Sequence, residues 1–194
     1  MTTMSKNQEN NIVKGLFFDL DGTLFDTDEA NFLSYKKSFL QKGFEVNKSQ
    51  FNEIKGTRSD YFIPILAPNI TKDDIQDIKK YKSKFYSELI DKIPPNNELI
   101  SFLATMRPHH KIALVSTASR ENAIPILKKA KIIDLFDLLI FGGDVKNSKP
   151  DPESYNLALQ GLNLRPDEVV AFEDSETGIL AARNAGIRVI KVKI

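Results

Sequence analysis

The chain has 194 residues, of which 41% are hydrophobic, and 27 basic against 26 acidic side chains leave a net charge of +1. This balance argues against a protein that binds nucleic acid or an anionic membrane surface, and no run of about 18 apolar residues predicts a membrane span. The sequence has no cysteine, which excludes disulfides, thiolate metal sites and thiol nucleophiles. We therefore expect a soluble, cytoplasmic monomer with one core and a small appended domain.

The first predicted element is a buried strand that ends in acidic residues. Residues 1–10 are polar and predict a loose tail without the apolar core of a signal peptide. Residues 12–18 (IVKGLFF) form a short apolar run typical of a strand in a parallel sheet. Asp19, Asp21 and Asp26 follow in the stretch FDLDGTLFD. Because aspartate is depleted in strands and common in turns, these residues predict a charged site at the mouth of a sheet.

The next segment, residues 27–91, predicts a small unit of three or four helices. Apolar side chains recur every three or four residues in the stretches 28–42 and 71–89, which is the spacing of one helix face. Thr71 is suited to cap the second of these helices. Two prolines, Pro64 and Pro68, interrupt a shorter apolar piece between them.

From residue 97 onward, helix and strand patterns alternate. The predicted strands are residues 111–115, 138–141, 169–172 and 187–192, and the predicted helices are residues 98–106, 121–130, 152–162 and 177–185. We expect Pro125 to be tolerated only near the first turn of its helix. The alternation predicts an α/β fold, a doubly wound parallel sheet with helices on both faces. Residues 11–26 and 92–194 would form this core, with residues 27–91 inserted after its first strand.

Polar residues follow four of the predicted strands. They are Asp19 and Asp21 after the first strand, Ser116 and Thr117 after the second, Lys149 after the third, and Glu173 and Asp174 after the fourth. Ligands of such sheets bind beyond the carboxyl ends of the strands. We therefore expect these side chains to gather at one edge of the sheet.

The residue types at this edge indicate phosphoryl transfer. Carboxylates that converge repel one another and need a cation, and oxygen ligands without histidine or cysteine suit Mg²⁺. The two histidines, His109 and His110, are adjacent and would point to opposite faces of a strand, so they make a poor metal pair. One carboxylate can act as a nucleophile and another as a general acid and base, while a lysine and hydroxyls suit phosphoryl oxygens. The pattern predicts metal-assisted transfer through an aspartyl-phosphate.

Four motifs in order, FDLDGTLFD, VSTAS, SKPDP and FEDSETG, resemble those of the haloacid dehalogenase-like (HAD) superfamily. The helical insert after the first motif resembles the cap domain of the β-phosphoglucomutase and phosphoglycolate phosphatase branch. The resemblance implies a Rossmann-like HAD core, a helical cap over residues 27–91, and a Mg²⁺-dependent phosphoric monoester hydrolase.

The resemblance also assigns roles to the matched residues near the first strand. Asp19 would be the nucleophile and a Mg²⁺ ligand. Asp21 would protonate the leaving oxygen and then activate water, and its backbone carbonyl would ligate Mg²⁺. Gly22 and Thr23 would shape the turn that follows the nucleophile.

The remaining motifs would complete the site. By the same resemblance, Ser116 would hydrogen-bond a phosphoryl oxygen with help from the backbone of Thr117. Lys149 would balance the carboxylate charge and orient the phosphorylated aspartate. Asp174 would be the second side-chain ligand of the metal, and Glu173 would bind the metal or lie next to it.

Substrate contacts are expected from the cap and from the loop after the second motif. Residues 55–58 (KGTR) are our candidate for the cap loop that faces the site, and Arg58 would bind a carboxylate or a second phosphate, unless it is a solvated helix-end arginine. Arg120 follows VSTAS and would also reach the substrate. Asp26 would support the hinge between insert and core.

Three functional hypotheses follow, and the first two act on a small phosphorylated substrate. The leading one is a phosphatase, because Asp21 lies two residues after Asp19, a position where dehalogenase relatives lack the acid. The second is a phosphomutase of the β-phosphoglucomutase kind, which would depend on a sugar bisphosphate. The third is a non-catalytic binding protein that keeps the fold.

Overall fold

The computed structural model describes residues 12–53 and 57–194, and its central feature is a five-stranded parallel sheet. The strands are β1 (Gly15–Phe18), β2 (Lys111–Val115), β3 (Leu138–Ile140), β4 (Val169–Glu173) and β5 (Arg188–Lys191). Their order is β3-β2-β1-β4-β5, so β1 is central, with Phe18 opposite Leu114 of β2 and Phe172 of β4. A chain that pairs β1 with strands about 100 and 150 residues away brings distant loops to one edge.

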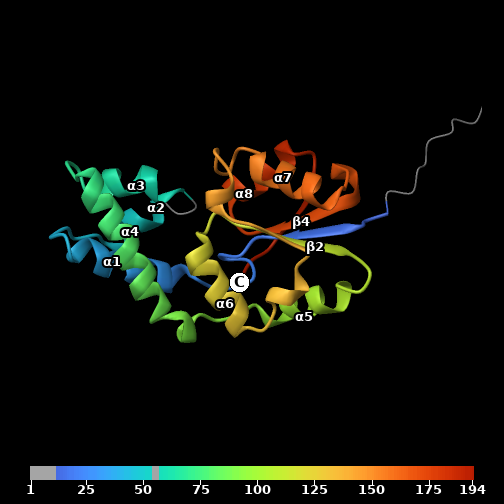
Figure 1. The fold of residues 1–194 in the computed structure, drawn as a ribbon, viewed down its shortest axis with the longest axis horizontal. Helices are drawn as coiled ribbons and strands as arrows, with labels where there is room; N and C mark the ends of the chain where they lie inside the picture. The colour runs from blue at the N-terminus through green and yellow to red at the C-terminus, as the bar shows by residue number, and fades with distance from the viewer. Residues whose placement is uncertain (1–11, 54–56) are drawn as a thin grey trace, which may run out of the picture.

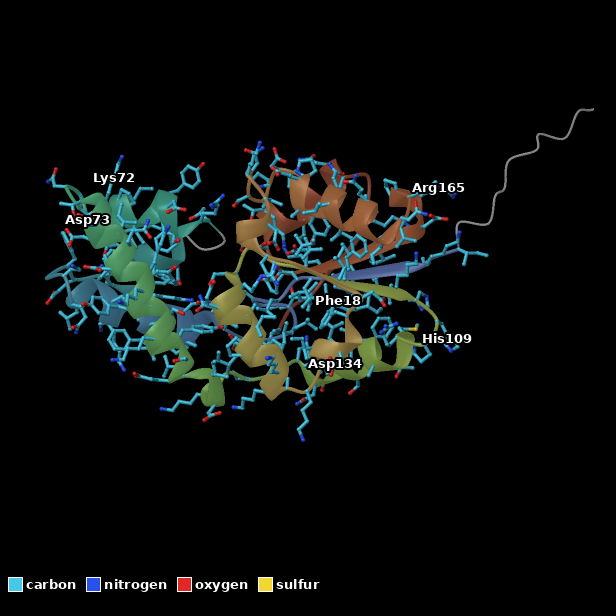
Figure 2. All side chains as sticks on the ribbon, in the orientation of Figure 1. Phe18, Lys72, Asp73, His109, Asp134 and Arg165 are labelled. Carbon is cyan, nitrogen blue, oxygen red and sulfur yellow. The ribbon has the colours of Figure 1, made fainter. Side chains whose placement is uncertain are left out.

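Helices cover both faces of the sheet, which confirms the predicted α/β fold (Figure 1). They are α5 (Asn97–Met106) and α6 (Arg120–Lys129) on one face, and α7 (Glu153–Leu162) and α8 (Glu176–Asn184) on the other. Short 3-10 turns occupy Ile90–Lys92, Ile133–Leu135, Gly142–Asp144 and Pro166–Glu168. Alternate residues of β1 enter the two cores: Phe18 packs on the α5 and α6 side, where its ring stacks on Phe172, and Phe17 packs on the α7 and α8 side. Figure 2 shows Phe18 deep in the middle of the side chains.

Helix α6 departs from one expectation, because it continues through Pro125 well past its first turn. Proline cannot donate the backbone hydrogen bond that the carbonyl of Glu121 would accept. Both residues are exposed, so water can bond to that carbonyl, and the helix tolerates the proline on its solvent side.

Four further helices lie between β1 and α5 in the described chain: α1 (Asp28–Leu40), α2 (Lys48–Glu53), α3 (Ser59–Leu66) and α4 (Lys72–Ser87). They gather beyond the end of the sheet at which β1 stops (Figure 1). The Thr71 hydroxyl accepts from the backbone N–H of Asp74 over 3.1 Å, so it caps α4 as predicted. Phe32, Phe39 and Ile78 belong to a separate apolar core within this group.

The outer end of the inserted helices and the turn after α5 lie at opposite ends of the molecule. Lys72 and Asp73 lie at the outer end of the inserted helices, and His109 lies at the opposite end (Figure 2). His109 is exposed and lies in the turn that follows α5. Within residues 12–53 and 57–194, no helix is long and apolar enough to cross a membrane.

Candidate active site

A cavity of about 570 Å³ lies between the carboxyl edge of the sheet and the inserted helices. The core contributes residues that follow β1, β2, β3 and β4, and the insert contributes residues from α1, α2, α3 and α4. The polar lining residues include Asp19, Asp21, Thr117, Lys149 and Asp174 from the core, and Asn31, Arg58, Lys79 and Lys82 from the insert. The predicted convergence of distant motifs on one edge is therefore present.

Lys149 is the centre of a buried charge cluster. Its ammonium group donates to Asp19 Oδ1 over 2.7 Å, to Glu173 Oε1 over 2.5 Å and to the backbone carbonyl of Val115 over 2.8 Å. Three acceptors thus meet the three ammonium protons. Burial alone would lower the pKa of Lys149, but Asp19 and Glu173 hold it above its usual value, so the lysine stays charged.

Asp19 is a carboxylate in a position where burial disfavours its charged form. Its backbone N–H donates to Phe172 O over 3.0 Å, which ties the turn to β4, and the residue is only 6% exposed. Burial raises the pKa of Asp19 well above its usual value; Lys149 opposes this shift, and the charges of Glu173 and Asp21 add to it. A cation beside Asp19 would therefore relieve both desolvation and repulsion.

Glu173 is fully buried, and only one of its two carboxylate oxygens has hydrogen-bond partners among the described residues. Its Oε1 accepts from Lys149 and from the Tyr155 hydroxyl, the latter over 2.6 Å. Its Oε2 has no hydrogen-bond partner among the described residues. Gly178 makes room for this carboxylate, because a Cβ on Gly178 would lie 2.1 Å from Oε2.

A carboxylate triad in the described chain has the composition of a magnesium site. One carboxylate oxygen from each of Asp19, Glu173 and Asp174 lies within 4.8 Å of the other two. The donors are all oxygen, as Mg²⁺ requires, and the orphaned Oε2 of Glu173 is a buried anionic atom that a nearby cation would stabilise. Gly22 has a φ of +77°, and a Cβ there would lie 2.2 Å from Asp174 Oδ2, so this position needs glycine.

Asp21 is oriented by the beginning of α1. Its Oδ1 accepts from the Thr27 hydroxyl over 2.5 Å and from Asn31 Nδ2 over 3.3 Å, and Asn31 also donates to Thr27 Oγ1 over 3.1 Å. Thr27 and Asn31 are separated by one helical turn, so both reach the same carboxylate. The contacts fix the Asp21 carboxylate at the start of α1, where the core meets the inserted helices.

The loop after β2 supplies the predicted hydroxyls in different settings. Ser116 is buried, its backbone N–H donates to Ile140 O over 3.0 Å, and its Oγ accepts from the N–H of Ala118. Thr117 lines the cavity. The phosphoryl contacts expected of these two residues remain predictions.

The two arginines expected at the substrate lie differently. Arg58 lines the cavity and donates to Lys146 O over 3.1 Å, with Asp60 3.5 Å away; Lys55 and Gly56 of its loop lie outside the described residues. Arg120 pairs with Asp144 over 3.2 Å, stacks over the ring of Phe141 and is not among the described residues that line the cavity. Its substrate role therefore stays a prediction without support from the cavity.

Several residues of the site were missed from the sequence: Thr27, Asn31, Tyr35, Lys82, Tyr86 and Tyr155. The position of Lys82 in the sequence could have indicated its role, because it lies four residues after Ile78 and four before Tyr86, on the apolar face of α4. A charged residue in an apolar stripe is unusual unless it serves a site. No sequence feature indicated Tyr155, because a tyrosine on the buried face of a helix is an ordinary core residue.

Comparisons with known proteins agree with this geometry. Residues 16–192 match the family model of the haloacid dehalogenase-like hydrolases. The chain is 34% identical to the phosphorylated carbohydrates phosphatase of Thermotoga maritima, over 90% of this chain and 82% of that protein. It is 30% identical to the β-phosphoglucomutase of Bacillus subtilis, over 93% and 83%. The crystal structure of CbbY from Rhodobacter sphaeroides in complex with phosphate superposes with a TM-score of 0.86 at 26% identity, covering 94% of this chain and 87% of that one.

Proposed function

Since the chain belongs to the haloacid dehalogenase-like hydrolase family, we propose that it is a phosphatase that hydrolyses a small phosphorylated metabolite through an aspartyl-phosphate. The observation that carries this proposal is the bridge from Lys149 to Asp19 and Glu173, with Asp21 facing the same cavity. The named phosphatase relative favours a phosphorylated carbohydrate as the substrate class.

In the first half of the proposed reaction, Asp19 is the nucleophile. A carboxylate oxygen of Asp19 attacks the phosphorus atom, and the bond from phosphorus to the ester oxygen breaks. Protonated Asp21 gives its proton to that leaving oxygen. Lys149 stabilises the charge at Asp19, while Ser116 and the backbone of Thr117 bind phosphoryl oxygens.

In the second half, Asp21 acts as the base. Its carboxylate takes a proton from water as the water oxygen attacks the phosphorus of the aspartyl-phosphate. The acyl–phosphate bond breaks, inorganic phosphate leaves, and Asp19 is regenerated with Asp21 protonated again. Thr27 and Asn31 keep Asp21 in place through both proton transfers.

We propose Mg²⁺ as the cofactor. Asp19, Asp174 and the backbone carbonyl of Asp21 would hold it, with Glu173 at or next to the ion; the oxygen-only donors and the unpartnered Glu173 Oε2 support this choice. When bound, the ion supplies positive charge against the carboxylates and phosphoryl oxygens.

We further propose that residues 27–91 are a cap and that residues 11–26 and 92–194 are the catalytic core. The cavity is lined from both parts, which supports a closed state that excludes water from the phosphoryl group. Arg58 would contact the substrate from the cap side.

A mutase is the second candidate, because a relative at 30% identity is a β-phosphoglucomutase and cations from the insert line the cavity. A mutase would return its phosphoryl group to a sugar instead of to water. Dependence on a catalytic amount of sugar bisphosphate would distinguish it.

The test is release of inorganic phosphate from a panel of phosphate esters, with Mg²⁺ or with EDTA, by wild type and Asp19→Asn. We expect Mg²⁺-dependent release that the substitution abolishes. Conversion of a sugar phosphate to its isomer without net release would favour the mutase. Neither activity across the panel would overturn the proposal in favour of a binding protein.

A further inference from the structure

Lys82 is a buried lysine at the insert side of the cavity. It lies on α4, lines the cavity and is only 6% exposed. Its ammonium group lies 4.0 Å from the ring centre of Tyr86 and 5.4 Å from that of Tyr35. The two rings form an aromatic cradle that accommodates a cation.

Lys82 lacks the counter-ion that buried lysines usually have. In the part of the chain that the structure describes, the ammonium group of Lys82 makes no hydrogen bond or ion pair. By contrast, Lys79, one turn before it, pairs with Asp60, and Lys42 pairs with Asp77. The charge of Asp21 acts on it only from a distance. Burial accordingly lowers the pKa of Lys82 to about 8, a shift that Asp21 opposes.

An unpaired ammonium group in such a position destabilises the protein until an anion arrives. The other cations of the insert wall differ from Lys82. Arg58 donates to Lys146 O, and both Arg58 and Lys79 meet Asp60, while Lys80, which also lines the cavity, is exposed to solvent. Lys82 is thus the cation of this wall that is both buried and without a partner among the described residues.

The position of Lys82 indicates which part of the substrate it would contact. Asp21, which would protonate the leaving oxygen, is held by Thr27 and Asn31 from α1, and α4 packs directly on α1. The phosphoryl group would lie on the other side of Asp21, at Asp19 and Lys149. A group bound by Lys82 therefore belongs to the part of the substrate that leaves.

Resting on the proposed phosphatase function, we propose that Lys82 binds a second anionic group, a carboxylate or a phosphate, on the leaving group of the substrate. The preferred substrate is then a phosphate ester with a further negative charge. Lys82 is the residue that determines this specificity.

The test compares ester pairs that differ in the second anionic group. Phosphoglycolate against ethyl phosphate probes a carboxylate, and glucose 1,6-bisphosphate against glucose 6-phosphate probes a phosphate. Wild type should favour the more anionic member of at least one pair by roughly 10-fold or more in kcat/KM, the range of a charge-assisted contact. Lys82→Met should remove this preference through KM, Lys82→Arg should retain most of it, and Lys84→Met, an exposed lysine on the same helix, should leave it unchanged.

Two results would overturn the role of Lys82: a wild type that favours the more anionic member of neither pair, or a Lys82→Met variant that loses activity on both members equally. Folding of each variant is checked by thermal unfolding. If wild type hydrolyses no ester, the proposed function fails separately. The role of Lys82 is then decided by calorimetric binding of the same pairs to wild type and Lys82→Met, where equal affinities would reject it.

Discussion

The Tyr155 hydroxyl donates to Glu173 Oε1 over 2.6 Å in a fully buried setting. With Lys149 on the same oxygen, it fixes the glutamate side chain and leaves Oε2 for another partner. Groups that orient metal-binding carboxylates commonly contribute 10–100-fold to metal affinity. Tyr155 is thus a positioning residue for the proposed metal site.

Tyr155→Phe should weaken Mg²⁺ binding by roughly 10-fold while keeping the fold, because the ring remains and only the hydroxyl is lost. Calorimetric titration with Mg²⁺ measures this directly. Tyr81→Phe, on the half-buried face of α4, is the matched control. An unchanged dissociation constant in Tyr155→Phe would show that Lys149 alone orients Glu173.

Gly178→Ala should be destabilising and should weaken Mg²⁺ binding. The added methyl group would meet Glu173 Oε2 at 2.1 Å, and the carboxylate cannot retreat because Lys149 and Tyr155 hold its other oxygen. Overpacking of this kind costs about 1–3 kcal/mol. Urea unfolding in EDTA measures the loss, with Leu180→Ala on the exposed side of the same helix as control. A change below about 0.5 kcal/mol would contradict the rigid placement of Glu173.

Asp19→Asn should stabilise the metal-free protein by about 1 kcal/mol while abolishing turnover, since active-site residues often cost stability. The pKa of Asp19 is raised in the folded state, first by burial, so the folded chain binds its proton more tightly than the unfolded chain does. Wild-type stability in EDTA therefore falls as pH rises from the usual carboxylate pKa to the raised one. The advantage of the variant should vanish at a pH below the usual carboxylate pKa. A variant that is less stable than wild type at pH 7 would contradict this reading.

Lys82→Met should also stabilise the protein at pH 7. A pKa lowered from 10.5 to about 8 corresponds to roughly 3 kcal/mol of unfavourable burial of the charge. Between these two values the unfolded chain binds more protons, so wild-type stability rises with pH and the gap to the variant closes. Chemical unfolding at pH 7 and pH 10 measures both effects, with Lys84→Met as control. Destabilisation by Lys82→Met at pH 7 would indicate that the lysine stabilises the insert instead of serving a ligand.

Much of the core site could be predicted from the sequence, because its signals are local. Each strand is a short apolar run, and each polar motif lies at the end of a run or in the loop after it, so a parallel sheet brings the motifs to one edge. Lys149 lies in the loop after β3, 130 residues from Asp19, and the rule places both residues at the same edge of the sheet, although it does not predict the hydrogen bond between them.

Side-chain direction and partner choice could not be predicted in this way. Arg120 follows VSTAS in the sequence, but it begins a helix and turns to Asp144, a partner that only the tertiary structure reveals. Lys82 and Asn31 depend on how α4 and α1 pack over the sheet edge. That arrangement is set by contacts between segments, which residue spacing does not contain.

The measurement that tests the account most directly is the trapping of a phosphoryl group on Asp19 during turnover. The reaction with the best ester of the panel is quenched in acid, treated with borohydride, which reduces an acyl phosphate to the alcohol, and analysed by peptide mass spectrometry. The account predicts reduction at Asp19 in wild type with Mg²⁺ and none in EDTA or in Asp19→Asn. Reduction at another carboxylate, or none while phosphate is being released and a related acyl phosphate is trapped in a parallel control, would contradict the aspartyl-phosphate.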